Sequence, residues 1–171
     1  MTSMDHRTLR AGRPRQPEIV DGELRLLLGS ELTAIEYGRL GLARFLAPLA
    51  LDSRVVNRIE VIFEELIANI VRHGFKDMTG GVIAVSAFAK PDGIVLTIED
   101  NGAPFNLLEA EEPAPFESLE TARIGGLGIP LIRRYSRNIH YERLKPAPGA
   151  AGELGQAHSG RNRLVVEVPR R

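Results

Sequence analysis

Apolar residues recur at helical spacing most strongly between residues 55 and 70. They return every three or four positions and form a broad stripe along one side of the expected helix. Asp52 or Ser53 is placed to cap the start of this helix, and Gly74 is placed to end it. The pattern therefore predicts a long helix with one buried face.

Weaker helical patterns flank this segment on both sides. Thr33 and Glu36 have the spacing of a capping box, which predicts the start of an earlier helix. Pro48 should end or bend that helix, because proline removes a backbone donor and clashes with the preceding turn. A later helix is expected to begin near Gly128.

Segments rich in β-branched and other apolar residues predict the strands. Turn-forming residues join them as hairpins, with Pro91-Asp92-Gly93 in one turn and a Gly/Ala/Pro-rich stretch over 145–160 in another. The expected strands are ELRLLLG, VIAVSAFAK, IVLTIE, NIHYERL and RLVVEVP. Their order among the helices predicts an α/β chain of the α+β type. It would be a two-layer sandwich in which helices cover one face of a mixed, mostly antiparallel sheet.

The first residues differ in composition from the rest of the chain. Residues 1–17 carry four arginines and two prolines and show no apolar periodicity. Such a segment cannot bury apolar surface and is not expected to pack. We therefore expect a mobile basic tail over residues 1–22 and a single domain over residues 23–171.

Composition excludes several classes of function. The 171 residues include 22 basic and 22 acidic side chains and no cysteine. Neutrality argues against nucleic-acid binding through bulk charge, and the lack of cysteine excludes disulfides, thiolate nucleophiles and cysteine zinc sites. No apolar run approaches the ~18 residues that span a bilayer, so no membrane association is expected. These observations predict a cytoplasmic protein.

Three polar side chains form a row on the flank of the buried helical stripe. Glu65, Asn69 and His73 follow one another at intervals of four residues, whereas Glu64 falls on the other flank. A carboxylate and an amide in line suit a general base and an oxygen ligand for a hard cation such as Mg²⁺. Taken alone, the row is better explained as the solvated edge of a helix.

Two glycine-containing segments are the other candidates for ligand binding. Asp100-Asn101-Gly102 follows a predicted strand, so Asp100 is placed to accept a hydrogen bond from a ligand amine and Gly102 to admit a flat ring. Gly125-Gly126-Leu127-Gly128 precedes the later helix, where exposed backbone N–H groups suit phosphate oxygens. Taken singly, an ordinary turn and a flexible loop explain these segments as well.

The order of the three motifs is more specific than any one of them. E-x-x-x-N on a helix, D-x-G-x-P-F after a strand, and GGLG before a helix occur here in succession. This arrangement resembles the GHKL-type ATPases, which include gyrase and the histidine kinases. Within that group, the chain is most similar to the anti-sigma-factor serine/threonine kinases of bacterial partner-switching systems. The resemblance covers about residues 23–169 and implies the Bergerat-type ATP-binding fold.

The resemblance implies roles for the helix row and for the aspartate motif. Asn69 would coordinate Mg²⁺ that bridges the phosphates of ATP. Glu65 would be the general base that activates water or a serine hydroxyl of a partner protein. Asp100 would bind the adenine amino group, and Gly102 would let the ring approach. Residues of about 106–125 would form the ATP lid.

It also implies the phosphate contacts. The backbone of Gly126, Leu127 and Gly128 would meet the phosphate oxygens at the start of the helix. His73 and Arg123 would lie near the lid and the phosphates.

The partners implied are a STAS-type anti-anti-sigma protein, which would be phosphorylated, and a sigma factor, which would be sequestered. A homodimer formed through the first strand and helix is expected by the same resemblance. The sequence departs from the family in its acidic lid and in its long 145–160 segment. An ATP-binding module that switches protein partners with little or no kinase activity is therefore the alternative function.

Overall fold

The computed structural model describes residues 15–76, 78–109, 128–145 and 160–171. Within them, the strands form one sheet in the order β1-β2-β3-β4-β6-β5, and every neighbouring pair is antiparallel. The strands are β1 (Arg15–Val20), β2 (Glu23–Gly29), β3 (Val82–Lys90), β4 (Gly93–Asp100), β5 (Asn138–Leu144) and β6 (Arg161–Pro169).

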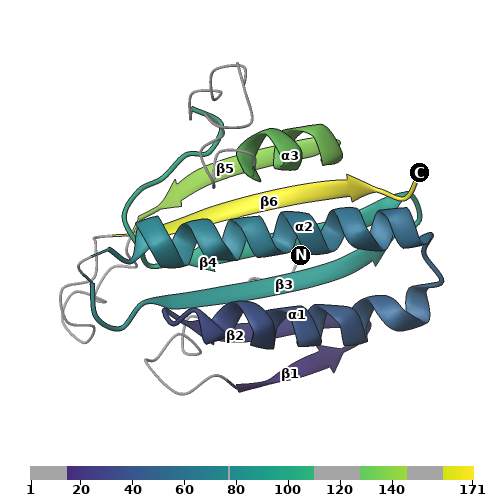
Figure 1. Cartoon of the computed structure of the whole chain (residues 1–171), viewed down its shortest axis with the longest axis horizontal. Coiled ribbons are helices and arrows are strands. Elements are labelled where there is room, and N and C mark those ends of the chain that lie inside the picture. The colour runs from purple at the N-terminus through teal and green to yellow at the C-terminus, as the bar shows by residue number, and fades with distance from the viewer. Residues whose placement is uncertain (1–14, 77, 110–127, 146–159) are drawn as a thin grey trace, which may run out of the picture.

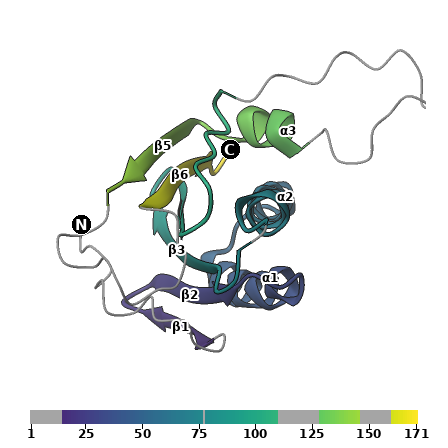
Figure 2. The same ribbon diagram turned by 90° about the vertical axis from the view of Figure 1, so that its left-hand side faces the viewer.

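The helices lie on one side of this sheet. They are α1 (Thr33–Leu46), α2 (Ser53–Asn69) and α3 (Gly128–Tyr135). Figures 1 and 2 show α1 over the β2 half of the sheet, α2 over its middle, and α3 beside β5 and β6. The predicted two-layer α+β sandwich is confirmed. No helix of the described residues is long and apolar enough to cross a membrane.

The core lies between the sheet and α2. Alternate residues of β4 and β6 point toward the helices, as the period of a strand requires. Phe63 and Ile62 of α2 are fully buried against them. The inward residues of these two strands are Ile94, Leu96, Ile98, Leu164, Val166 and Val168.

The predicted tail is wrong for residues 15–22. Arg15–Val20 form β1, which turns through Asp21 and Gly22 and pairs with β2. β1 is an edge strand, and Ile19 and Val20 remain 49% and 44% exposed. Backbone pairing rather than core burial holds it, which explains why the sequence shows no hydrophobic signal there. Residues 1–14 lie outside the described residues.

The ends of the first two helices follow the sequence in part. The capping box is wrong: the Thr33 hydroxyl lies 3.4 Å from a Glu31 carboxylate oxygen, and Glu36 pairs with Arg39. The predicted stop at Pro48 is confirmed, since α1 gives way to a short 3-10 turn, η2 (Ala47–Leu49). Asp52 caps α2, because its Oδ1 accepts a hydrogen bond of 2.8 Å from the Arg54 N–H.

Gly38 sets how closely α1 packs on α2. A methyl group at this position would lie 2.5 Å from Cζ of the fully buried Phe63 ring. We expect Gly38→Ala to lower the free energy of unfolding by about 1–3 kcal/mol, because the ring has no free volume into which to move. Gly29→Ala is the control, since no atom lies within 4 Å of its methyl group. Urea unfolding of both variants measures the difference, and equal midpoints would contradict this packing.

Candidate nucleotide-binding site

A cavity lies where the C-terminal ends of α2 and β4 meet the start of β6. Apolar side chains form most of its wall, and Asn69, Asp100 and Asn162 supply polar groups. An apolar cavity with a few convergent polar groups is typical of a small-molecule site. The lining residues are Leu66, Asn69, Ile70, Gly74, Ile98, Asp100, Ala103, Phe105, Leu107, Tyr141, Asn162 and Leu164.

Asp100 is held rigidly in the wall of this cavity. It is 5% exposed, and its Oδ1 accepts hydrogen bonds from the Gly102 N–H at 2.8 Å and from Asn162 Nδ2 at 2.9 Å. No described residue donates to its Oδ2. Burial raises the pKa of the Asp100 carboxyl, although both donors and the charge of Arg143 oppose that shift. One oxygen is therefore fixed by the protein while the other remains available to a donor on a ligand.

Asn162 is a polar residue of the cavity wall that the motifs did not identify. Besides Asp100, its Nδ2 donates to the Ala103 carbonyl at 2.8 Å. Its Oδ1 accepts from the Tyr141 hydroxyl at 2.8 Å and from Arg143 Nη1 at 2.9 Å. The sequence carried a signal for it, because Asn162 occupies an inward position of a strand whose other inward positions are apolar. A polar residue in that phase needs buried partners.

Gly102 is required by the packing of the protein itself. A methyl group there would lie 2.6 Å from the Gly74 carbonyl oxygen and 2.8 Å from Asp100 Oδ1. The Gly74 carbonyl also accepts a hydrogen bond of 2.9 Å from the Ala103 N–H. Gly74 ends the π-turn η3 (Ile70–Gly74) that follows α2. The contact of the Gly74 carbonyl with Gly102 and Ala103 therefore joins the turn after α2 to the segment that follows β4.

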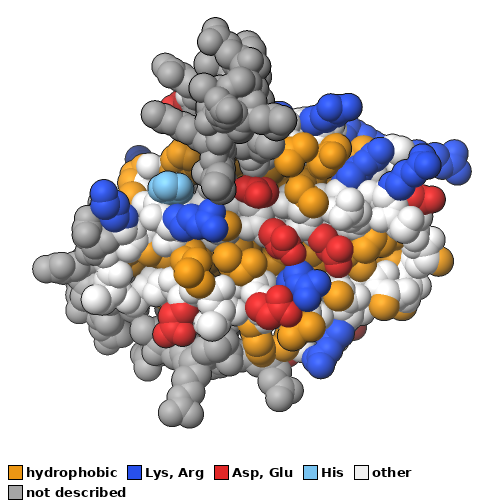
Figure 3. Space-filling model, in the orientation of Figure 1, with side chains coloured by type: hydrophobic (Ala, Val, Ile, Leu, Met, Phe, Trp, Pro, Cys, Tyr) orange, Lys and Arg blue, Asp and Glu red, His pale blue; other side chains and the backbone are white. Residues whose placement is uncertain are grey.

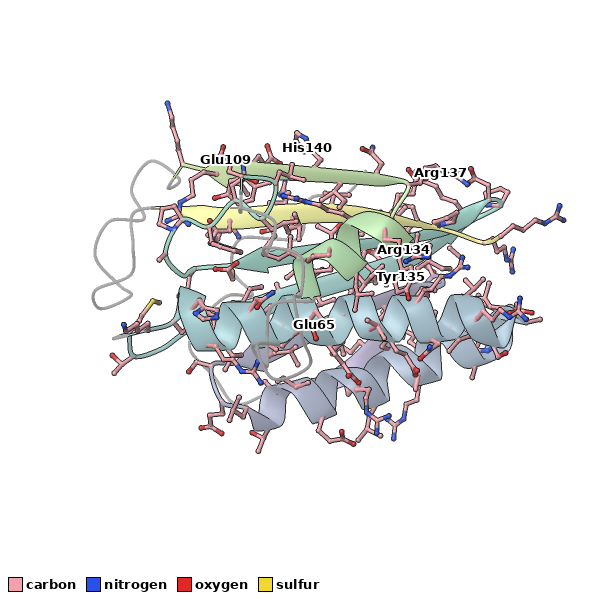
Figure 4. All side chains as sticks on the ribbon, turned by 45° about the horizontal axis from the view of Figure 1, so that its top comes forward. Glu65, Glu109, Arg134, Tyr135, Arg137 and His140 are labelled. Atoms are coloured by element: carbon pink, nitrogen blue, oxygen red, sulfur yellow. The ribbon has the colours of Figure 1, made fainter. Side chains whose placement is uncertain are left out.

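Glu65 and Asn69 lie in one row on α2, as predicted. Asn69 lines the cavity, and no described residue forms a hydrogen bond with its side chain. The Glu65 carboxylate packs against the start of α3, where a methyl group on Gly128 would lie 2.2 Å from Glu65 Oε2 (Figure 4). The Glu65 carboxylate thus meets the start of α3 one helical turn before Asn69, which lies in the cavity wall.

Comparison with known proteins agrees with this geometry. Residues 29–151 match the family described as the histidine kinase-like ATPase domain. This chain belongs to that family. A serine-protein kinase RsbW of Listeria monocytogenes is 31% identical over 114 residues, which are 64% of this chain and 73% of the relative. An anti-sigma F factor of Bacillus thuringiensis is 28% identical over 104 residues, 60% of this chain and 70% of the relative.

A solved structure gives a more distant likeness. It is the histidine kinase domain of the blue-light activated histidine kinase EL346 from Erythrobacter litoralis. The sequence identity is 13% and the TM-score is 0.42, and the alignment covers 77% of this chain and 60% of that one.

The donor set of this ATPase-family site fits Mg²⁺ held jointly with phosphate. Asn69 offers a hard amide oxygen beside the cavity and has no described partner of its own. The described residues contain no group of three His, Cys, Asp or Glu side chains that could hold a metal by themselves. Magnesium is commonly bound by one or two protein oxygens together with substrate phosphates and water. Asn69 therefore suits a metal that arrives with a nucleotide.

The cavity is nearly filled in the described conformation. The cavity volume between its lining side chains is about 30 Å³, which is room for only a few water molecules. Leu107 is 4% exposed, and Arg133 Nη2 donates to the carbonyls of Leu107 and Leu108 at 3.1 Å each. Phe105, at the same rim, is 41% exposed. A purine ring can enter only if these lining side chains move apart.

Of the remaining predicted site residues, the structure describes only His73. His73 lies exposed on η3 and does not line the cavity. Arg123, Gly126 and Leu127 lie outside the described residues, as does the expected lid from residue 110 onward. Its first residues, 106–109, form a turn in which Asn106 Oδ1 accepts from the Leu108 N–H at 3.0 Å.

The Asn162 network predicts the effect of a single truncation. Asn162→Ala removes one of the two donors to Asp100 Oδ1 and leaves Tyr141 and Arg143 without their shared acceptor. We expect the free energy of unfolding to fall by about 1–3 kcal/mol and Mg-ATP affinity to fall roughly tenfold. Urea unfolding and calorimetric titration measure the two effects. Unchanged affinity would show that Asn162 does not position Asp100.

Proposed function

We propose that this chain is an anti-sigma factor and an ATP-dependent protein serine/threonine kinase. It binds ATP in the cavity at Asp100, phosphorylates a STAS-type anti-anti-sigma protein and sequesters a sigma factor. The arrangement of Glu65, Asn69 and Asp100 at one end of α2 carries the proposal, and the names of the relatives support it.

The adenine ring binds first in this account. Asp100 Oδ2 accepts a hydrogen bond from the exocyclic amino group, because Oδ1 is already occupied by Gly102 and Asn162. The apolar wall of Leu66, Ile98 and Leu164 contacts the faces of the ring. The triphosphate then extends toward Asn69 and the start of α3, where helix N–H groups favour anions.

Glu65 acts on the nucleophile. Its carboxylate accepts the proton of a serine hydroxyl as that oxygen bonds to the γ-phosphorus, and the bond to the bridging oxygen breaks to release ADP. Asn69 holds Mg²⁺, which when bound neutralises charge on the phosphate oxygens. Phosphoryl transfer relies on positioning and charge neutralisation, and these groups supply both.

A homodimer is part of the proposal. Ile19 and Val20 on the edge strand β1 and Leu40 on α1 are 49%, 44% and 52% exposed. An edge strand with exposed apolar side chains is suited to pairing with a second copy of the chain.

The proposed function also implies a location. A protein that acts on a sigma factor works in the cytoplasm, where we place this chain.

The alternative is a partner-switching module with little or no kinase activity. The acidic residues of the predicted lid favour this alternative, because their negative charge would repel the triphosphate of a bound nucleotide. They are Glu109, Glu111, Glu112, Glu117 and Glu120.

Incubation of the full chain with Mg-[γ-³²P]ATP and each STAS-type protein of the same organism distinguishes the two functions. We expect one STAS protein to be labelled on one serine. Nucleotide-dependent binding of that protein with no phosphoserine, even after long incubation, would favour the switching module. No binding and no label with any of them would contradict both.

A further inference from the structure

The end of α2 away from the nucleotide site carries a second hollow, of about 560 Å³. The start of α2 and the ends of α3 and β6 form its wall. Its four cations are all arginines, and we call it the arginine hollow: Arg54, Arg58, Arg134 and Arg171. Figure 3 shows basic side chains gathered over this end of the molecule. Arg58 precedes Asn69 by about three helical turns, roughly 16 Å, so the two sites are separate.

No described carboxylate pairs with the side chains of these four arginines. Three acids on neighbouring segments make other contacts. Asp52 caps α2, and Asp92 pairs with Arg137. Glu60 faces α1, where its charge acts on Arg39. No ion pair among the described residues therefore neutralises the arginines of the hollow.

The rest of the wall is aromatic and polar. The Arg58 guanidinium lies over the Tyr135 ring, 5.8 Å from its centroid, and this contact restrains the charged group. Arg134 and Tyr135 stand next to each other at the end of α3, above α2 (Figure 4). Asn57, Ser136 and Pro169 complete the hollow.

We propose that the arginine hollow binds an acidic segment of a partner protein, with at least two carboxylates close together. Guanidinium groups bind carboxylates through paired hydrogen bonds, so restrained arginines suit this ligand. Arginine and tyrosine beside apolar surface is the composition of protein interfaces. A nucleic acid is disfavoured because the whole chain has no net positive charge. The proposal adds a docking site to the proposed function and does not depend on the nucleotide.

Fluorescence anisotropy of the full chain with a labelled EELEELEELE peptide tests the proposal without nucleotide or phosphotransfer. We expect binding that weakens from 50 to 200 mM salt, roughly as screening requires. The QQLQQLQQLQ peptide should not bind. No binding of the acidic peptide would overturn the proposal, whatever the outcome of the kinase assay.

Paired variants locate the site. Arg54→Ala with Arg134→Ala removes two exposed arginines of the hollow. Arg44→Ala with Arg72→Ala removes the same charge from exposed positions outside it. We expect the first pair to weaken peptide binding at least tenfold and the second less than twofold, with unchanged melting temperatures. Lysine at positions 54 and 134 should restore part of the affinity, because it keeps the charge but not the paired geometry.

Two results would overturn the assignment. Equal weakening by both pairs would show that binding follows net charge rather than the hollow. Displacement of the peptide by tripolyphosphate or single-stranded DNA at lower concentrations than by unlabelled peptide would assign the hollow to phosphate.

Discussion

Replacing Glu65 with alanine is expected to slow phosphotransfer by about 100- to 10,000-fold while Mg-ATP still binds, which is the range that a positioned general base contributes. Glu65 packs against Gly128 at the start of α3 but does not line the cavity around Asp100. The variant should therefore keep its affinity for the nucleotide within about threefold. Single-turnover labelling of the STAS partner and calorimetric titration measure the two quantities separately.

Glu64→Ala is the matched control. This neighbouring carboxylate lies on the other flank of α2, 3.9 Å from Arg39 in an exposed ion pair that contributes little stability. We expect its phosphotransfer chemistry to proceed at the wild-type rate with saturating partner. A Glu65→Ala protein that labels the partner as fast as the wild type would show that another group, or none, is the base.

Replacing Asp100 with asparagine is expected to weaken ATP binding by about 100-fold or more, or about 3 kcal/mol. The Gly102 N–H and Asn162 Nδ2 would still hold the Oδ1 of the substituted side chain, since that atom remains an acceptor. The amide nitrogen of the new side chain would then face the adenine amino group, and two donors would oppose each other. Calorimetric titration with Mg-ATP measures the loss.

The same substitution should not destabilise the fold. Burial raises the pKa of the Asp100 carboxyl, so the folded chain holds this proton more tightly than the unfolded chain does. The contribution of this group to stability is present below its ordinary pKa and is lost as the pH rises through the raised value. Asp100→Asn removes this loss of stability at higher pH. Its melting temperature at pH 7 should equal or exceed that of the wild type, and a large decrease would contradict this account of Asp100.

Most of the fold could be predicted from the sequence because its elements bury regular apolar patterns. The α2 stripe and the alternation along β4 and β6 each lead to core contacts. β1 could not be predicted in this way, since its side chains remain exposed. The capping box failed because Thr33 starts the helix instead of preceding it, and its spacing to Glu36 carries no information about the register.

The site was predictable only for residues that belong to the three ordered motifs. Asp100 and Gly102 were identified from the order of the three motifs, because an aspartate and a glycine after a strand are also typical of an ordinary turn. Gly102, however, is needed for the Gly74 carbonyl, a contact between segments distant in sequence. Asn162 was missed for the same reason, because its partners lie on β4, on β5 and in the turn after β4.

In the proposed function, nucleotide recognition depends on one interaction, the acceptance of the adenine amino group by Asp100. Parallel calorimetric titrations of the wild-type chain with Mg-ATP and Mg-GTP test it directly. Guanine presents a carbonyl oxygen in place of that amino group, so two acceptors would face each other. We predict one ATP bound per chain and GTP binding weaker by about 100-fold or more. Equal affinity for the two nucleotides, or no binding of ATP, would contradict the role of Asp100 and the proposed function with it.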